Sequence, residues 1–390
     1  VLDLVTHAVM KTVVVGSNSF FLEITPDGSE VYIANTGSAD VGVLSTATNT
    51  LIATIAVGFS PNYLAITPDS ARVYVVNQGS DSISVIDTAT HTVLKTIKTN
   101  IGTLPIYVRV TSDGRQAYVT NNGDGTVSVI DTALNVVSAV IQVGNAPFFV
   151  TINPDSKEAY VSNSADGTVS VIDTKTNTVI TTVTVGTAPQ FLTTSPDGSK
   201  VYVSNNLSRS VSIIDTKTRS VVATVPVGSH PTVSAFTSDG TLSYVVNNFD
   251  NTISVIDVAS ATNIDTIDVG SAPISVVFPQ GYKSLPLHKH LPPFLPSQVL
   301  VKGRQKKNIF LSQVEIFNVI SWDAMIEIVP VSYLIYRDAA LTILAKKVLA
   351  HEPLIFIDHN CKPNTICTYY IVAATQNSGQ FLIGSTTIYP

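Results

Sequence analysis

The stretch from residue 195 to residue 228, SPDGSKVYVSNNLSRSVSIIDTKTRSVVATVPVG, decides the fold, because almost everything before residue 282 is a copy of it. It holds three runs rich in Val, Ile, Ser and Thr, and a fourth run precedes its first turn. Such runs between turn residues are typical of β-strands. Pro196 pre-sets φ, the Asp197 carboxylate can accept backbone N–H groups, and Gly198 can be left-handed. The stretch predicts one four-stranded antiparallel sheet.

Two aspartates mark the copies independently, with a period in the low forties. The turn aspartates lie at Asp27, Asp69, Asp113, Asp155, Asp197 and Asp239. The aspartates that close the third strand lie at Asp3, Asp87, Asp131, Asp173, Asp215 and Asp257, with Ser45 in the vacant slot. Four strands in a unit of this length indicate a propeller blade, in which stacking on the neighbours buries both faces of each sheet.

The two ends of the repeat region each hold part of a blade. Residues 1–15 align without gaps on residues 171–185, and residues 270–281 restart the motif as a first strand. Six whole blades and one split blade, shared by the ends of the region, predict a seven-bladed propeller over residues 1–285. A start further upstream would allow eight.

The motif at the second strand carries a family resemblance. The copies read Tyr-Ile-Ala-Asn, Tyr-Val-Val-Asn, Tyr-Val-Thr-Asn and Tyr-Val-Ser-Asn, beginning at residues 32, 74, 118, 160, 202 and 244. With the following IDT and VG elements, residues 1–282 resemble the YVTN-repeat β-propellers. That family includes archaeal surface-layer proteins and bacterial exported proteins, and the resemblance implies a binding or surface module.

The period stops after a stiff, proline-rich linker at residues 286–296, whose His288 and His290 make only a weak metal-ligand pair. Residues 297–390 have strand runs at the spacing of a β-sandwich. Their order of aromatic motifs resembles an immunoglobulin-like fibronectin type III domain, which implies a core role for Trp322 and a tyrosine corner at Tyr369 or Tyr370. Cys361 and Cys367 could close a small disulfide loop, or remain two free thiols.

Composition excludes several classes of protein. The net charge of −6 argues against nucleic acid, and no apolar run reaches membrane-spanning length. The chain starts without Met or a leader, so either a leader has been removed or the chain is a fragment. Known nucleophile, zinc-protease, P-loop and dinucleotide motifs are not found, and no cofactor or metal is expected.

The first strands line the centre of a propeller, and they carry the candidate binding residues. One slot is aromatic in five copies, at Phe21, Tyr63, Tyr107, Phe149 and Phe191, while Val233 and Ser275 fill the other two. Two positions further on, Glu23 and Arg109 are the only charges on any first strand. These residues could form a ligand site with aromatic walls. Alternatively, the rings pack between blades while the two charges satisfy one another.

Two functions follow as hypotheses. The first is a non-catalytic, secreted or cell-surface interaction protein, a monomer that presents loops on one rim to a protein or glycan, with the fibronectin-like module as a spacer. The alternative is an enzyme of lactonase or lyase type that acts in the central channel. An intracellular scaffold is a third possibility.

Overall fold

The computed structural model describes residue 1, residues 9–98 and residues 100–276, together with the backbone of the strands between residues 302 and 388. The chain divides into two compact units, Val1–Leu285 and Pro286–Pro390. Apart from a single 3-10 turn, η1 (Gln78–Ser80), the described elements are all strands. No helix in these ranges is long and apolar enough to cross a membrane.

The first unit contains six antiparallel four-stranded sheets, each with its strands in chain order. The first three blades are β1 (Ser19–Ile24), β2 (Glu30–Asn35), β3 (Asp40–Ser45), β4 (Thr50–Ala56); β5 (Pro61–Ile66), β6 (Arg72–Asn77), β7 (Ser82–Asp87), β8 (Thr92–Ile97); and β9 (Pro105–Val110), β10 (Gln116–Asn121), β11 (Thr126–Asp131), β12 (Val136–Gln142). The next three are β13 (Pro147–Ile152), β14 (Glu158–Asn163), β15 (Thr168–Asp173), β16 (Thr178–Thr184); β17 (Pro189–Thr194), β18 (Lys200–Asn205), β19 (Ser210–Asp215), β20 (Ser220–Pro226); and β21 (Pro231–Phe236), β22 (Leu242–Asn247), β23 (Thr252–Asp257), β24 (Thr262–Asp268).

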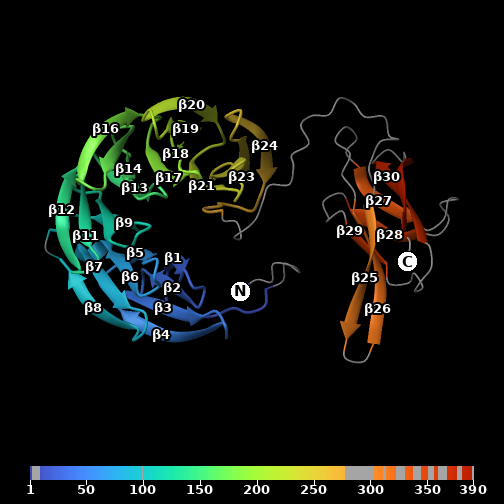
Figure 1. Cartoon of the computed structure of the whole chain (residues 1–390), viewed down its shortest axis with the longest axis horizontal. Helices are drawn as coiled ribbons and strands as arrows, with labels where there is room; N and C mark the ends of the chain where they lie inside the picture. Colours follow the sequence, from blue (N-terminus) through green and yellow to red (C-terminus); the bar gives the residue numbers. More distant parts are fainter. Residues whose placement is uncertain are drawn as a thin grey trace. The chain divides into compact units, whose positions relative to one another are not determined.

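The blades stand side by side around a common centre, with β1, β5, β9, β13, β17 and β21 innermost and the fourth strands outermost (Figure 1). This arrangement confirms the all-β, propeller-like part of the prediction. The seventh blade falls largely on residues 2–8 and 277–285, which lie outside the described residues.

The predicted turn chemistry is confirmed at the quoted repeat. The Asp197 carboxylate accepts the Ser195 hydroxyl at 2.6 Å and the Ser199 backbone N–H at 3.0 Å. Gly198 has φ of 72°, where a side chain would be strained. At the second anchor, Asp215 accepts the Thr218 N–H at 2.8 Å. Both aspartates therefore stabilise turns.

The Tyr and Asn of the second-strand motif have separate structural roles. The tyrosines pack inside the blades, and five of them are fully buried: Tyr32, Tyr74, Tyr118, Tyr160 and Tyr202. The asparagine ends the strand and ties it to the next. Asn163, for example, donates to the Thr168 hydroxyl at 3.0 Å and the Ser170 hydroxyl at 2.9 Å. The backbone N–H of Gly144, in the preceding blade, donates to the same asparagine at 3.2 Å, so the motif also joins neighbouring blades.

The second unit contains two antiparallel sheets, described here by backbone alone. Their strand orders are β25-β26-β29 and β28-β27-β30-β31. The strands are β25 (Lys302–Phe310), β26 (Gln313–Ser321), β27 (Pro330–Tyr336), β28 (Leu344–Leu349), β29 (Ile355–Asp358), β30 (Cys367–Thr375) and β31 (Gln380–Ile388). The predicted linker, the core role of Trp322 and the Cys361–Cys367 loop lie outside the described residues and side chains.

Candidate functional site

The five aromatic residues of the first strands form one continuous row of ring contacts around the centre, which we call the aromatic collar. Neighbouring ring centroids are 4.9 Å apart for Phe21 and Tyr63, 4.9 Å for Tyr63 and Tyr107, 3.9 Å for Tyr107 and Phe149, and 5.4 Å for Phe149 and Phe191. Each contact joins one blade to the next, and edge or offset geometries of this kind stabilise aromatic pairs. The structure thus brings all five candidates together and gives them a packing role.

The two charged candidates, which we call the central charged pair, come from β1 and β9. Glu23 is half-buried, and Arg109 stays accessible to water although it lies on an innermost strand. No ion pair of 4.0 Å or less joins Glu23 to Arg109 in the described coordinates. The alternative in which the two charges simply neutralise each other by direct contact is therefore not what the structure shows.

Burial raises the pKa of Glu23 from 4.5 to about 7, and the positive charge of Arg109 and a backbone hydrogen bond at Ile66 only partly oppose this effect. Desolvation disfavours the carboxylate, whereas the cation favours it. The result is a carboxyl group that changes its protonation near neutral pH.

Arg109 is held by its neighbour on the same strand. The electrostatic interaction and a hydrogen bond with Tyr107, together with the attraction of Glu23, raise the pKa of Arg109 against the effect of burial, so the guanidinium stays charged. Burial raises the pKa of Tyr107 to about 12, which keeps that phenol neutral at physiological pH. The centre thus combines one permanent cation, one carboxyl with a near-neutral pKa, and aromatic walls.

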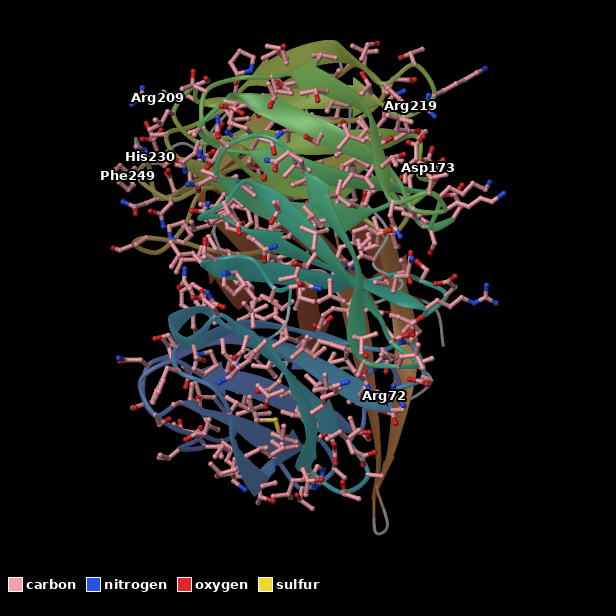
Figure 2. All side chains as sticks on the ribbon, turned by 90° about the vertical axis from the view of Figure 1, so that its left-hand side faces the viewer. Arg72, Asp173, Arg209, Arg219, His230 and Phe249 are labelled. Atoms are coloured by element: carbon pink, nitrogen blue, oxygen red, sulfur yellow. The ribbon has the colours of Figure 1, made fainter. Side chains whose placement is uncertain are left out.

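The described histidines lie away from this centre. His230 stacks on Phe249 at 3.6 Å, and both lie on one rim with Arg209, opposite the rim that carries Arg72, Asp173 and Arg219 (Figure 2). His91 bonds Glu30 at 2.9 Å in a strand-connecting turn. Within the described ranges, no cluster of three or more His, Cys, Asp or Glu could hold a metal ion.

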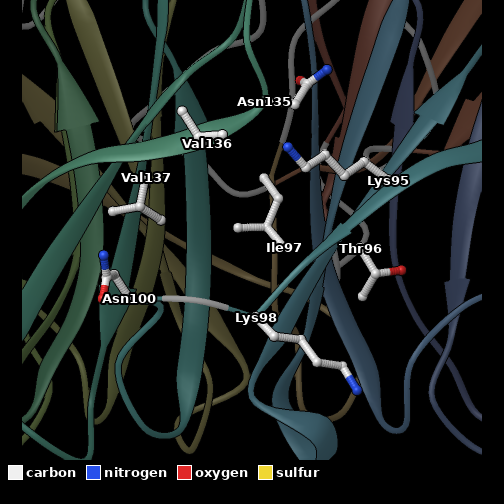
Figure 3. Close-up of a pocket in the computed structure, with 8 residues that line it drawn as sticks. All are labelled: Lys95, Thr96, Ile97, Lys98, Asn100, Asn135, Val136 and Val137. Carbon is white, nitrogen blue, oxygen red and sulfur yellow. The ribbon is translucent and has the colours of Figure 1, made fainter.

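A cavity of about 300 Å³ lies between the outer strands of the second and third blades (Figure 3). Lys95, Lys98 and Asn135 are among its lining residues. The outer strands repeat without a distinctive residue pattern, so the sequence gives no signal for this cavity. It offers two exposed lysines and no second kind of reactive group, so it is a weaker candidate than the centre.

Two family models match the repeat region. One, described as a YNCE-like beta-propeller, matches residues 18–115 and 197–280, and the other, described as a cytochrome D1 heme domain, matches residues 69–186. Among solved structures, Kuenenia stuttgartiensis hydrazine synthase is similar, with a TM-score of 0.57 and 24% identity over 66% of this chain and 88% of that chain. No curated protein matches the chain.

These matches correct the sequence-based prediction of a non-catalytic surface or secreted interaction protein. The prediction is wrong because one of the two matching family models, over residues 69–186, is described as a cytochrome D1 heme domain, which favours the alternative of an enzyme. Neither of the two family models describes a fibronectin or surface-layer domain. What the repeats, the strand order and both family models establish together is a YVTN-like β-propeller.

Proposed function

We propose that the propeller is an enzyme that acts on a small molecule at its centre, with Glu23 as the proton-transfer group. The observation that carries this proposal is the central charged pair, in which Glu23 has a pKa of about 7 and makes no ion pair within 4.0 Å with Arg109. A general acid or base works best when its pKa lies near the working pH. The heme-domain and synthase matches support an enzyme over a spacer.

The chemistry that suits this centre is the hydrolysis of a lactone. Ionised Glu23 accepts a proton from water while the water oxygen forms a bond to the carbonyl carbon. Arg109 donates hydrogen bonds to the oxygen that becomes negative. When the C–O bond of the ring breaks, Glu23 returns its proton to the leaving oxygen, so the proton balance closes. An elimination would use the same base and cation.

A lactone assay tests this function. We expect dihydrocoumarin, whose ring matches the aromatic collar, to be hydrolysed with acid release measurable in a pH-stat. Glu23→Gln should lower kcat/KM by about 100-fold, the usual size of a general-base contribution. The rate should rise with pH through about 7. Asp268→Asn, on the exposed outermost strand β24, is the control. Wild-type protein no faster than buffer, or an equally fast Glu23→Gln variant, would contradict the proposal.

The described residues do not fit a heme, the group named by one matching model. Neither described histidine of the propeller faces the centre. The oxygen donors there are Glu23, Tyr63 and Tyr107, and burial raises the pKa of both tyrosines, which disfavours the phenolate that iron binds. We therefore assign no step to heme. When the protein is titrated with hemin, we expect no shift of the Soret band. A shifted band that disappears in Tyr107→Phe would show that Tyr107 binds the iron and would contradict this conclusion.

We also propose that the propeller has seven blades, the seventh built from residues 1–15 and 272–286. Support comes from the first strand of blade 1. Phe20, Leu22 and Ile24 are 61%, 60% and 52% exposed, whereas the same positions in blade 2, Asn62, Leu64 and Ile66, are 8%, 1% and 7% exposed. An apolar face of this size needs a cover.

Both ends of the described region dock as parts of such a blade. Asn35 donates to the Val15 carbonyl at 3.0 Å, at the joint where Gly144 meets Asn163 in a later blade. Asn248 donates to the Pro273 carbonyl at 2.8 Å, as Asn122 does to Pro147 at 3.2 Å. Residue 15 therefore occupies the position at which the fourth strand of a blade ends, and residue 273 the position at which a first strand begins.

For the second unit we propose a fibronectin type III-like domain. The support is the division into a three-stranded and a four-stranded antiparallel sheet. The predicted monomer and the predicted location outside the cytoplasm remain proposals.

A further inference from the structure

The centre of the propeller presents one cation with spare hydrogen-bonding capacity. Arg109 is the only base on the six described first strands, and its guanidinium carries five N–H donors in a planar fork. The interaction found for it on its own strand is with Tyr107, and Glu23 attracts it without an ion pair within 4.0 Å. Because Arg109 remains accessible to water, a ligand can reach the fork.

The walls beside this cation are aromatic. Tyr107 lies two residues before Arg109 on β9, so both side chains leave the same face of the strand. The Tyr107 ring stacks on Phe149 at 3.9 Å and meets Tyr63 edge-on at 4.9 Å. These contacts bury Tyr63 and Tyr107, whereas Phe21, Phe149 and Phe191 are only half-buried. The ring surface open to a ligand therefore belongs to the phenylalanines, and flat, apolar rings favour a planar group.

The second charged residue at the centre is Glu23, and its protonation state determines whether the centre can accept an anionic ligand. An ionised Glu23 would repel an anion, whereas a protonated Glu23 leaves the centre with a net positive charge and offers one O–H donor. A carboxylate ligand on Arg109 would in turn weaken the attraction that keeps Glu23 ionised. Ligand binding and protonation of Glu23 should therefore support each other.

We infer that the centre binds a small aromatic carboxylate, held by its carboxylate on Arg109 and by its ring against the aromatic collar, with Glu23 protonated in the complex. This inference rests on the proposed function and names the class of compound that its site takes: an aromatic carboxylic acid, which is also what hydrolysis of an aromatic lactone releases. A bidentate contact of guanidinium with carboxylate supplies the orientation.

Among the residues that the structure describes, no other group near Glu23 titrates in the same pH range. Across the strand, Tyr32 pairs in register with Glu23 and donates its hydroxyl to Glu30 at 2.8 Å. From β5 the neighbouring aromatic is Tyr63, and from β9 come Tyr107 and Arg109. Burial raises the pKa of all three tyrosines, so between pH 6 and pH 8 only Glu23 changes its charge here.

The experiment is a calorimetric titration of the full chain with benzoate, with benzyl alcohol as the neutral probe of the same shape. At pH 6 we expect benzoate to bind at least tenfold more tightly than benzyl alcohol. Its affinity should fall about tenfold at pH 8, and binding at pH 7 should take up protons from the buffer. Arg109→Gln should lose at least tenfold in affinity, whereas Arg109→Lys, which keeps the charge, should lose less.

Two variants separate the site from general charge effects. Arg115→Gln removes an exposed arginine whose side chain is 85% accessible, and it should bind benzoate like the wild type. Glu23→Gln should bind benzoate with equal affinity at pH 6 and pH 8. Equal binding of benzoate and benzyl alcohol, or equal binding by wild type and Arg109→Gln, overturns the inference, as does no binding by the folded wild type at 10 mM benzoate. If benzoate binds but no lactone is hydrolysed, the proposed enzyme activity is wrong and the inferred carboxylate site stands. If a lactone is hydrolysed in a reaction that depends on Glu23 but benzoate does not bind, the enzyme activity stands and the inferred site is wrong.

Discussion

The hydroxyl of Tyr118 donates a hydrogen bond of 2.6 Å to the side-chain oxygen of Asn177, a turn residue of the next blade. Tyr74 makes the same bond to Asn135 at 2.6 Å. At the equivalent position two blades after Tyr118, the buried Tyr202 hydroxyl has no hydrogen-bond partner in the structure, because Ala261 stands where the asparagine would be. The tyrosine of the repeat therefore forms a hydrogen bond to the next blade when the facing turn residue is asparagine, as at Asn177, and lacks it when that residue is alanine, as at Ala261.

This difference predicts opposite effects of matched substitutions. Tyr118→Phe should lower the free energy of unfolding by about 1 kcal/mol, because it deletes a partly buried hydrogen bond. Tyr202→Phe should be neutral or stabilising, and Ala261→Asn should stabilise, because Ala261 has φ of 52° and asparagine tolerates that conformation well. Urea denaturation measures all three, and an equal loss in both tyrosine variants would refute the account.

The joint between the fifth and sixth blades leaves no room for a methyl group at Gly228. A Cβ there would lie 2.6 Å from the side-chain carbon Cγ of Asn247, a buried residue bonded to Thr252 and Ser254. Gly228→Ala should destabilise the protein by about 1–3 kcal/mol through overpacking. At Gly270 a Cβ would meet nothing within 4 Å, so Gly270→Ala serves as the control. A similar loss in thermal stability for both variants would argue against this joint.

The proposed seventh blade predicts the cost of shortening Leu22. If the blade covers β1, Leu22→Ala should destabilise by about 2–4 kcal/mol, as Leu64→Ala should at the 1% exposed position of the second blade. If β1 remains open, the change should cost less than about 0.5 kcal/mol. Denaturant midpoints of the two variants decide between these outcomes.

The raised pKa of Glu23 predicts that this carboxyl destabilises the fold at alkaline pH. A group whose folded pKa lies above its unfolded value favours the protonated native state, so the penalty begins above pH 4.5 and is complete above pH 7. Glu23→Gln should therefore raise the free energy of unfolding at pH 8 by about 3 kcal/mol and leave it unchanged at pH 4. Unfolding measured at both pH values tests this, with Asp268→Asn as the control. An equal gain at both pH values would mean that charge is not the cause.

Much of the propeller follows from local rules that the sequence displays openly. The Pro-Asp-Gly turn specifies its own hydrogen bonds, since the Asp197 carboxylate, the Ser199 N–H and the left-handed Gly198 are all within three residues. The turn aspartate recurs in all six copies, and the left-handed position after it is Gly in four copies and serine at Ser70 and Ser156. Because these short-range features are periodic, the strand boundaries and the blade length could be predicted. The aromatic slot of the first strands was also visible, because it is periodic.

The function of the centre could not be predicted in the same way. Glu23 and Arg109 are 86 residues apart in sequence, and nothing local indicates that their charges interact across the centre without an ion pair within 4.0 Å. The low charge, the regular repeats with their resemblance to YVTN-repeat propellers and the fibronectin-like C-terminal part predicted a non-catalytic protein, and the match to the cytochrome D1 heme domain overturned that prediction. A sequence motif describes residues at a fixed local spacing, whereas Glu23 and Arg109 come together only because the blades pack around a common centre.

The sequence by itself determined the repeat, the turns and the four-stranded blade, because each depends on backbone preferences and on contacts within a few residues. Only the tertiary structure decided that five aromatic rings join into one collar, that Tyr202 lacks the partner Tyr118 has, and that burial brings the pKa of Glu23 close to 7. The physical reason is that burial and electrostatic fields depend on groups brought together from different blades, and these distances are set by packing around the centre rather than by position in the chain.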